Sequence, residues 1–331
     1  MSTVPTPSIN TEAAAKKPTP AGAGLNLASP TSAPVRWRQV VLITAGALAL
    51  YAAFRALPTG TNLHSNDFNL QGKGMVELCD PSNPQFIAVT TARSPVSMTL
   101  RENPPAARGG ETRLIIALST ATGKPVGPAD LLVEHTRKLH LLVVDPTLND
   151  YQHLHPEPGE TYGEWTVAFT PRLAGVYRVF ADFVPLPTGR SLYASADLSV
   201  KGVTEFLKPR FSWDAELEGY HFKLTPDVPM RAGQAANLAF DISRRDGTGV
   251  PLELVMDAYA HLVAFDQKQS GFAHLHPLAE GASGVVAPPD ATQPRLNFRI
   301  TIPNAGVYVI WAQVKIAGRE LFAPFWFEVA P

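Results

Sequence analysis

The sequence contains one histidine-rich pattern twice. Residues 140–156 read HLLVVDPTLNDYQHLHP and residues 261–277 read HLVAFDQKQSGFAHLHP, and both fit the template H-x4-D-x5-[YF]-x-H-L-H-P. Six of the nine histidines of the chain occupy these two copies at the same offsets. A long pattern repeated about 120 residues later in the chain indicates two tandem copies of one domain.

Both halves of the chain consist of short runs typical of β-strands. The runs are rich in Val, Thr, Tyr and Phe and are separated by Gly, Pro and Asn turns, as in ETRLIIALS and EWTVAFT in the first half and RLNFRIT in the second. Gly-Val-Tyr opens a late run in each half, at residues 175–177 and 306–308, as at the corner of an immunoglobulin-like sandwich. The sequence therefore predicts an all-β fold of two tandem immunoglobulin-like β-sandwiches. Their cores are expected to include Leu114, Ile116, Trp165, Tyr177, Phe180, Leu238, Phe240, Tyr308 and Trp311.

The N-terminal part of the chain has a different composition. Residues 1–35 are rich in Ala, Pro, Ser and Thr, which predicts a disordered tail because such a segment can bury little apolar surface. Val40–Leu57 then forms an apolar run with the single charge Arg55, long enough to span about 27 Å as a helix. The basic residues before it predict that the tail stays in the cytoplasm. We expect an uncleaved, single-pass anchor in the cytoplasmic (inner) membrane, and the alternative is a cleaved signal peptide.

These features predict an order of segments along the chain. The parts downstream of the anchor are expected to be exported, to the periplasm or the cell exterior if the cell is bacterial. The expected segments are a disordered cytoplasmic tail (1–35), a transmembrane anchor (36–57), a linker (58–85), a first β-sandwich (86–202), a second linker (203–217) and a second β-sandwich (218–331).

Charge and cysteine content exclude several classes of function. The formal net charge of the chain is −1, so no strong basic field indicates binding to nucleic acid. The single cysteine, Cys79, cannot form an intramolecular disulfide or a cysteine-based zinc or iron–sulfur cluster.

The spacing of the histidines predicts that each copy brings three imidazoles together. If residues 140–145 and 150–155 form a hairpin around the four residues 146–149, His140 lies opposite His155, and His153 lies on the same face. The same register in the second copy brings His261, His274 and His276 together. A turn of five residues would instead move His140 to the other face and break the site.

Four further residues accompany the two sets of histidines. His135 lies five positions before His140, and Met256 lies five positions before His261, so we expect each to stand near the histidines of its own copy. His and Met are both ligands of copper, and Met suits Cu(I) in particular. Asp145 and Asp266 close a run just before a turn, and we interpret them as turn residues or as partners that orient a histidine.

One family resemblance follows from these motifs. The segment HTRKLHLLVVDPTLNDYQHLHPEP, followed by GVYRVFADFVPLPTG, resembles the YtkA-like family of exported, membrane-anchored bacterial domains. The second copy is more divergent, because Met256 replaces the first histidine and WAQV (311–314) replaces FADF (180–183). The resemblance implies an immunoglobulin-like sandwich, a membrane or extracytoplasmic location and a role in handling metals.

Two functional hypotheses follow from the sequence. The first is a membrane-anchored, exported metal-binding protein that buffers, senses or delivers copper through one site per domain, with zinc as the alternative ion and a protein partner for metal transfer. In this hypothesis the metal-binding residues are His135, His140, His153, His155, Met256, His261, His274 and His276. The second hypothesis is a structural or interaction ectodomain without metal. We expect no enzymatic activity, since no carboxylate stands at a clear spacing to act as a general base, and a metal-dependent hydrolase or oxidase is the alternative.

Two chemical expectations accompany the copper hypothesis. Metal affinity should fall as the pH drops through about 6.5, because imidazole binds metal only when it is neutral. The second site should favour Cu(I) because it contains Met256, while the first, all-histidine site should better tolerate Cu(II) or Zn(II).

Overall fold

The computed structural model describes residues 36–56, 63–68, 85–205, 207–278 and 287–331. The expected disordered tail (1–35) and most of the expected linker (58–85), with Cys79, lie outside the described residues. The chain divides into two units, Met1–Pro58 and Thr59–Pro331, which are considered separately.

The first unit contains the helix α1 (Trp37–Ala56). Its window Trp37–Phe54 has a mean hydropathy of 1.4, and none of that window is buried inside the protein. Large apolar side chains such as Trp37, Ile43 and Phe54 are exposed. The helix is thus long and apolar enough to cross a membrane, within the segment predicted as an anchor.

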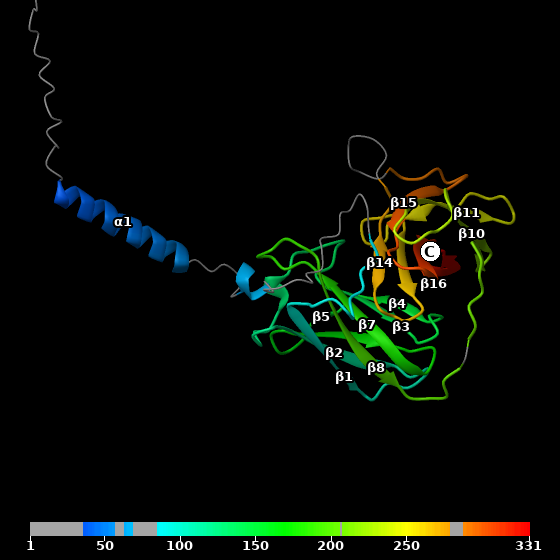
Figure 1. Ribbon diagram of the computed structural model, residues 1–331, viewed down its shortest axis with the longest axis horizontal. Helices are drawn as coiled ribbons and strands as arrows, with labels where there is room; N and C mark the ends of the chain where they lie inside the picture. The colour runs from blue at the N-terminus through cyan, green and yellow to red at the C-terminus, as the bar shows by residue number, and fades with distance from the viewer. Residues whose placement is uncertain (1–35, 57–62, 69–84, 206, 279–286) are drawn as a thin grey trace, which may run out of the picture. The chain divides into compact units, whose positions relative to one another are not determined.

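The first sandwich consists of two antiparallel four-stranded sheets (Figure 1). One has the strand order β1-β2-β6-β5, from β1 (Val96–Asn103), β2 (Thr112–Thr120), β5 (Glu157–Pro158) and β6 (Glu164–Phe169). The other has the order β4-β3-β7-β8, from β3 (His140–Val144), β4 (Tyr151–Leu154), β7 (Gly175–Phe183) and β8 (Leu192–Val200). The core of the first sandwich contains the expected Leu114, Ile116, Trp165 and Tyr177. Two short 3-10 helices, η1 (Ser65–Phe68) and η2 (Pro128–Asp130), complete this half, and Phe68 is buried against the same core.

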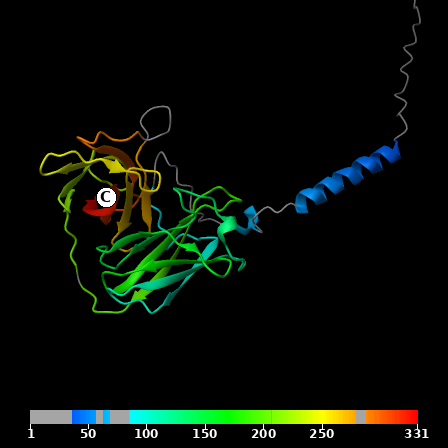
Figure 2. The same cartoon turned by 180° about the vertical axis from the view of Figure 1, so that it is seen from behind.

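The second sandwich repeats this plan and is seen from behind in Figure 2. One sheet has the order β15-β11-β10-β9, from β9 (Asp214–Leu217), β10 (Tyr220–Pro226), β11 (Ala235–Arg244) and β15 (Arg295–Thr301). The other has the order β12-β16-β13-β14, with β17 also paired to β16, from β12 (Leu252–Glu253), β13 (His261–Asp266), β14 (Phe272–Leu275), β16 (Gly306–Ile316) and β17 (Arg319–Val329). The expected Leu238, Phe240 and Tyr308 lie in its core. The predicted all-β fold with two sandwiches is therefore confirmed.

A tyrosine corner closes each sandwich, as the two Gly-Val-Tyr segments predict. The hydroxyl of Tyr177 donates a hydrogen bond to the carbonyl of Leu173 at 2.9 Å, and that of Tyr308 donates to the carbonyl of Asn304 at 3.0 Å. Each bond ties the start of a late strand to the loop before it.

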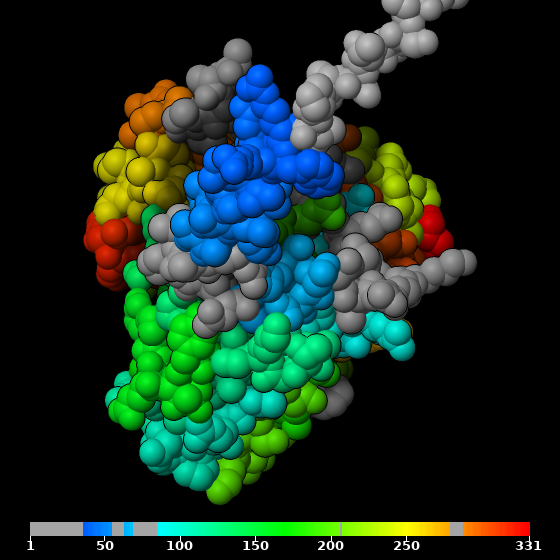
Figure 3. Space-filling model, turned by 90° about the vertical axis from the view of Figure 1, so that its left-hand side faces the viewer, coloured from blue at the N-terminus to red at the C-terminus, as the bar shows by residue number. Residues whose placement is uncertain are grey.

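Phe180 and Trp311 are buried, but outside the two sandwich cores in which the sequence predicted them. They belong to a third apolar cluster, which joins the outer face of the sheet containing β3 and β7 to the outer face of the sheet containing β13 and β16. Its buried members are Val89, Leu142, Val144, Leu148, Tyr151, Phe180, Tyr193, Val263, Phe265, Phe272, Val309, Trp311 and Trp326. In the space-filling view the cyan and green residues of the first sandwich gather below the yellow and orange residues of the second (Figure 3).

The chain crosses between the sandwiches before the first one begins. Gln85 and Ile87 form β-bridges with Thr301 and Phe272 of the second sandwich, and Phe86 lies in the core of that sandwich. The first strand of the first sandwich begins only at Val96. Likewise, β9 lies within the segment 203–217 that was expected to be a linker. The two sandwiches are thus held together by chain crossover as well as by packing.

Candidate metal centre

Each histidine pattern forms a hairpin in the register that the sequence predicts. In the first hairpin Leu141 pairs with Leu154 and Leu142 pairs with His153. In the second, Leu262 pairs with Leu275 and Val263 with His274, which is the same register. Side chains alternate along a strand, so the histidines share the outer face of each sheet with the apolar cluster between the sandwiches.

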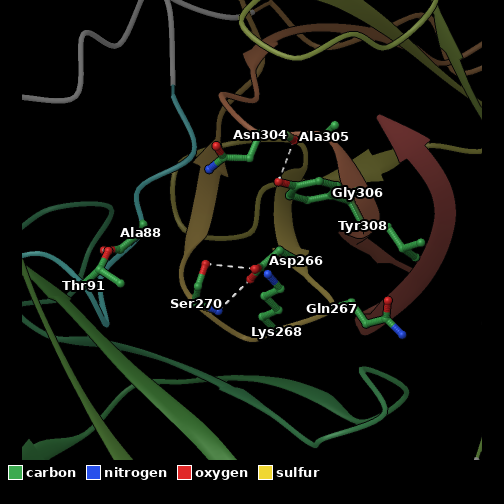
Figure 4. A pocket seen from close by; sticks show the side chains of 11 residues that line it. Ala88, Thr91, Asp266, Gln267, Lys268, Ser270, Asn304, Ala305, Gly306 and Tyr308 are labelled. Carbon is green, nitrogen blue, oxygen red and sulfur yellow. Dashed lines mark hydrogen bonds between the residues drawn. The ribbon is translucent and has the colours of Figure 1, made fainter. Parts of the chain in front are cut away.

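The turns of both hairpins are held by an aspartate, Asp145 directly after β3 and Asp266 at the end of β13. The carboxylate of Asp145 accepts hydrogen bonds from the amides of Thr147, Asn149 and Asp150 at 2.7 to 2.8 Å. Asp266 accepts bonds from the amide and the hydroxyl of Ser270, at 2.6 and 2.9 Å (Figure 4). Both residues are turn residues, one of the two roles that the sequence suggested, and the turns fix the register that aligns the histidines.

The three histidines of each hairpin converge on one point. His140, His153 and His155 form the first triad, and His261, His274 and His276 form the second. In each triad one nitrogen of every ring lies within 4.8 Å of the other two. These two triads could each hold a metal ion, and among the described residues they are the histidine, cysteine and carboxylate groups with such geometry.

Hydrogen bonds define the tautomers of the first triad. His140 Nε2 lies 3.0 Å from the carbonyl oxygen of Glu134, which only accepts, so this nitrogen carries the proton. His153 Nδ1 lies 2.9 Å from Gln313 Oε1 and donates to it, because the amide nitrogen of Gln313 faces the carboxylate of Glu320. The remaining nitrogens, His140 Nδ1 and His153 Nε2, lie 3.2 Å apart and both present a lone pair. Two lone pairs that face each other at this distance could hold a cation together.

The second triad repeats this arrangement. His261 Nε2 donates to the carbonyl of Val255 at 3.0 Å, and His274 Nδ1 lies 3.4 Å from the carboxylate of Asp182. His261 Nδ1 and His274 Nε2 again face each other at 3.2 Å. The nitrogen pair that could hold a cation is therefore duplicated along with the hairpin.

The third histidine of each triad has a buried nitrogen without a partner. Neither His155 Nε2 nor His276 Nε2 makes a hydrogen bond with any described residue. A buried polar atom without a partner raises the free energy of the folded state unless a ligand occupies the space beside it. These two nitrogens are therefore available to a ligand at each triad.

Burial keeps the triad histidines neutral. Loss of solvent lowers the pKa of His140, and it lowers the pKa of His153, His274 and His276 well below the usual range. It also lowers the pKa of His155 to about 3 and that of His261 to about 4. Neutral imidazole is the form that binds metal, so both triads are ready to bind near pH 7.

The two triads face each other across the contact between the sandwiches. The rings of His153 and His274 have centroids 5.5 Å apart, and those of His140 and His274 are 6.3 Å apart. Each central histidine is oriented by the opposite sandwich, since His153 bonds Gln313 of β16 and His274 bonds Asp182 of β7. The two sites thus share one buried histidine cluster.

A family model matches the chain twice, over residues 91–202 and 215–331, and its description is "Domain of unknown function (DUF8832)". The matched segments together cover more than half of the chain. The chain belongs to the DUF8832 family. The resemblance to the YtkA-like family is not confirmed by this match. No curated protein matches the chain.

Solved structures resemble the DUF8832 chain only distantly. "Putative membrane anchored protein" from Corynebacterium diphtheriae is 8% identical, with 72% of this chain and 59% of that chain covered and a TM-score of 0.21. The alpha-2-macroglobulin of E. coli is 13% identical, with 76% and 17% covered and a TM-score of 0.21. The fibronectin(III)-like modules of Clostridium thermocellum CbhA are 12% identical, with 70% and 94% covered and a TM-score of 0.19. The chain spans 59% and 17% of the length of the first two, and similarities this low carry no argument about function.

His135 and Met256 occupy the same place in the two DUF8832 repeats, and His135 lies near His140 of its own copy, as expected, but closer to the triad of the other repeat. Each is the first residue of a tight two-residue turn with positive φ, 47° for His135 and 50° for Met256. The ring of His135 lies 4.0 Å from that of His276 and 6.4 Å from that of His140, measured between centroids. His135 thus stands against the triad of the other repeat, because its turn projects across the contact between the sandwiches. Met256 is half-buried.

Asp182 and Gln313 are site residues that the sequence did not reveal. They occupy matching positions, because His140 pairs with Asp182 and His261 pairs with Gln313 in the two sheets. The signal was present in the aligned segments FADF and WAQV, where the third residue is polar in both repeats. A polar residue inside a buried strand indicates a partner, although the sequence does not say that the partner lies in the other repeat.

Proposed function

We propose that this chain is a membrane-anchored, exported protein that binds copper at two histidine triads, one in each DUF8832 repeat, and that it buffers, senses or delivers the ion without catalysing a reaction. The observation that best supports metal binding is the 3.2 Å separation between two lone-pair nitrogens in each triad. Two imidazole nitrogens bound to one tetrahedral metal ion at 2.0–2.1 Å lie about 3.3 Å apart. A proton between them would create a buried imidazolium, which the lowered pKa values disfavour.

Copper is favoured over other ions by the ligand set. Among divalent first-row metals Cu²⁺ binds nitrogen sites most tightly, and neutral imidazole suits copper, zinc and nickel. Met256, five positions before His261 in the sequence, would add a thioether that Cu(I) accepts. Zinc is the alternative ion, and the experiment below compares its binding with that of copper.

The proposed location follows from α1 and from the charges around it. Residues 1–57 hold five Lys or Arg side chains and one acidic residue, and most of the positive charge precedes the apolar run. We therefore place the N-terminus in the cytoplasm and both repeats outside it. A reporter that is active only in the cytoplasm should be inactive when it is fused to the C-terminus, and activity there would overturn this orientation.

Metal analysis of the full chain tests the proposed function. The purified protein is stripped of metal, dialysed at pH 7.5 against equimolar copper and zinc, and analysed for bound elements. We expect two equivalents of metal per chain, mostly copper. Two equivalents of zinc would keep the metal sites and overturn the choice of copper. Binding no tighter than that of a variant with all six triad histidines changed to alanine would favour the structural ectodomain instead.

A further inference from the structure

His135 is held in a strained and well-anchored turn. Residues Glu134 and Arg137 exchange backbone hydrogen bonds at 2.8 and 2.9 Å around His135 and Thr136, whose φ angles are 47° and 70°. Such turns favour Gly and Asn, so a histidine followed by a β-branched threonine here stores backbone strain. The carbonyl of Glu134 also accepts the hydrogen bond from His140 Nε2, which ties the turn to the first triad. The hydrogen bonds of Glu134 with Arg137 and His140 hold the turn in this strained conformation and so fix the position of His135.

In this position His135 lies against the second triad. The centroid of the His135 ring lies 4.0 Å from that of His276, 5.8 Å from that of His261 and 6.3 Å from that of His274. Its closest neighbour among these, His276, is the histidine whose Nε2 is buried without a hydrogen-bond partner among the described residues. An imidazole from the first repeat therefore stands beside the ring that carries the unpaired nitrogen of the second repeat.

We propose that His135 supplies a fourth nitrogen ligand to the metal centre of the second triad, so that the ion bound there is held by both repeats. This inference rests on the proposed metal-binding function. Four nitrogen ligands make a closed tetrahedral centre, the form typical of sites that retain their metal, and the ion becomes a cross-link between the two sandwiches.

The test separates the two triads before His135 is changed. In the full chain, His153→Ala with His155→Ala leaves only the second triad, and His274→Ala with His276→Ala leaves only the first. His135→Asn is then added to each, because asparagine tolerates the left-handed turn and lacks the imidazole. We expect His135→Asn to weaken Zn²⁺ and Co²⁺ binding at least tenfold when only the second triad is present, and to leave binding unchanged when only the first is present.

Two further measurements distinguish ligation from a role in shaping the turn. Thr136→Asn changes the neighbouring turn residue and should leave the affinity of the second triad unchanged. The visible bands of bound Co²⁺ report its ligand number and geometry, so His135→Asn should change them at the second triad. If the double variants fold poorly, His135→Asn in the otherwise unaltered chain should weaken one of the two bound equivalents and leave the other unchanged.

The outcomes separate this inference from the proposed function. If neither triad binds metal, the proposed function fails. If both bind, and His135→Asn weakens neither or weakens only the first, the function stands and the fourth ligand is refuted. Lower affinity with unchanged Co²⁺ bands would also refute ligation, since His135 would then only position His276.

Discussion

The two triads share their internal geometry and differ in their surroundings. In both, the first histidine donates to a backbone carbonyl at 3.0 Å and faces the second histidine at 3.2 Å. The first triad is oriented by the neutral amide of Gln313, and its His155 lines a cavity of about 790 Å³ together with charged residues such as Glu157 and Glu164. The second is oriented by the carboxylate of Asp182 and has His135 beside it.

This difference shows that duplication copied each hairpin, while the contact between the repeats made the two sites unequal. A carboxylate that accepts a bond from a ligating histidine makes that imidazole a stronger donor than an amide does. If both triads bind metal as proposed, the carboxylate of Asp182 and the nearby His135 should favour a divalent ion at the second triad, while His155 of the first triad borders a cavity. The expectation from sequence that the second site favours Cu(I) rests on Met256 and stays a prediction.

Removing the triads one at a time should have the largest effect on the amount of metal bound. His153→Ala with His155→Ala should remove one of two bound metal equivalents, and His274→Ala with His276→Ala should remove the other, because each triad loses two of its three ligands. Equilibrium dialysis with elemental analysis measures this loss. His221→Ala is the matched control, since His221 lies in β10 and pairs with Asp214 on the surface. Loss of both equivalents in either variant would mean one joint site.

Lowering the pH tests whether the histidines of both triads are buried and neutral. Burial lowers the pKa of His261 to about 4 and that of His155 to about 3, whereas unfolded histidines titrate near 6.5. Between these values the unfolded chain binds more protons, so the metal-free protein should lose stability as the pH falls from about 6.5 towards 4, by on the order of 3 kcal/mol for His261 alone. Urea unfolding at pH 7.5, 6 and 5 measures the loss.

One buried group opposes this trend. Burial raises the pKa of Asp182 to about 6, so the folded state gains a proton there before the unfolded chain does, which offsets part of the loss from the histidines. Equal stability at pH 7.5 and pH 5 would contradict the neutral triads. The lowered pKa values also move the fall in metal affinity to a lower pH than the 6.5 expected from the sequence.

The sequence predicted the hairpins well because their geometry is local. A four-residue turn and the alternation of side chains along a strand are sufficient to place His140 opposite His155, and the structure has that register. The two aspartates were also predictable, because turn residues bond to amides a few positions away.

The contact between the repeats could not be predicted in the same way. The strand HLLVV is buried on both faces, and such a run gives no sign of which face meets the sandwich core and which meets the other repeat. Phe180 and Trp311 were therefore assigned to the wrong cluster. The bond from His153 to Gln313 joins residues 160 positions apart, a contact that no local pattern encodes.

Substituting one tryptophan in a sandwich core and one between the repeats tests how much each region contributes to stability. Trp165 is fully buried in the first core, and Trp311 lies between the sandwiches, where its Nε1 donates to the carbonyl of Leu148 at 3.2 Å. Either change to alanine should cost about 3–5 kcal/mol. Calorimetry should show that Trp165→Ala destabilises the first sandwich, while Trp311→Ala separates the unfolding of the two. A single, unshifted transition in Trp311→Ala would contradict the packed contact.

Exchanging the groups that orient His153 and His274 should have the smallest effect on metal affinity. Asp182→Asn keeps an oxygen for His274 and removes the charge, and it should weaken divalent metal binding at the second triad by about tenfold to a hundredfold, because the imidazole becomes a weaker donor. Gln313→Glu should strengthen metal binding at the first triad. As a single change, however, it would place the new carboxylate against that of Glu320, to which the Gln313 amide donates at 2.8 Å. Glu320→Gln in the same chain restores that hydrogen bond, so the double variant is the matched counterpart. Titration with Zn²⁺ of chains that keep a single triad should show the two affinities moving in opposite directions, and unchanged affinities in both would mean that the inequality comes from His135 and the cavity at His155 alone.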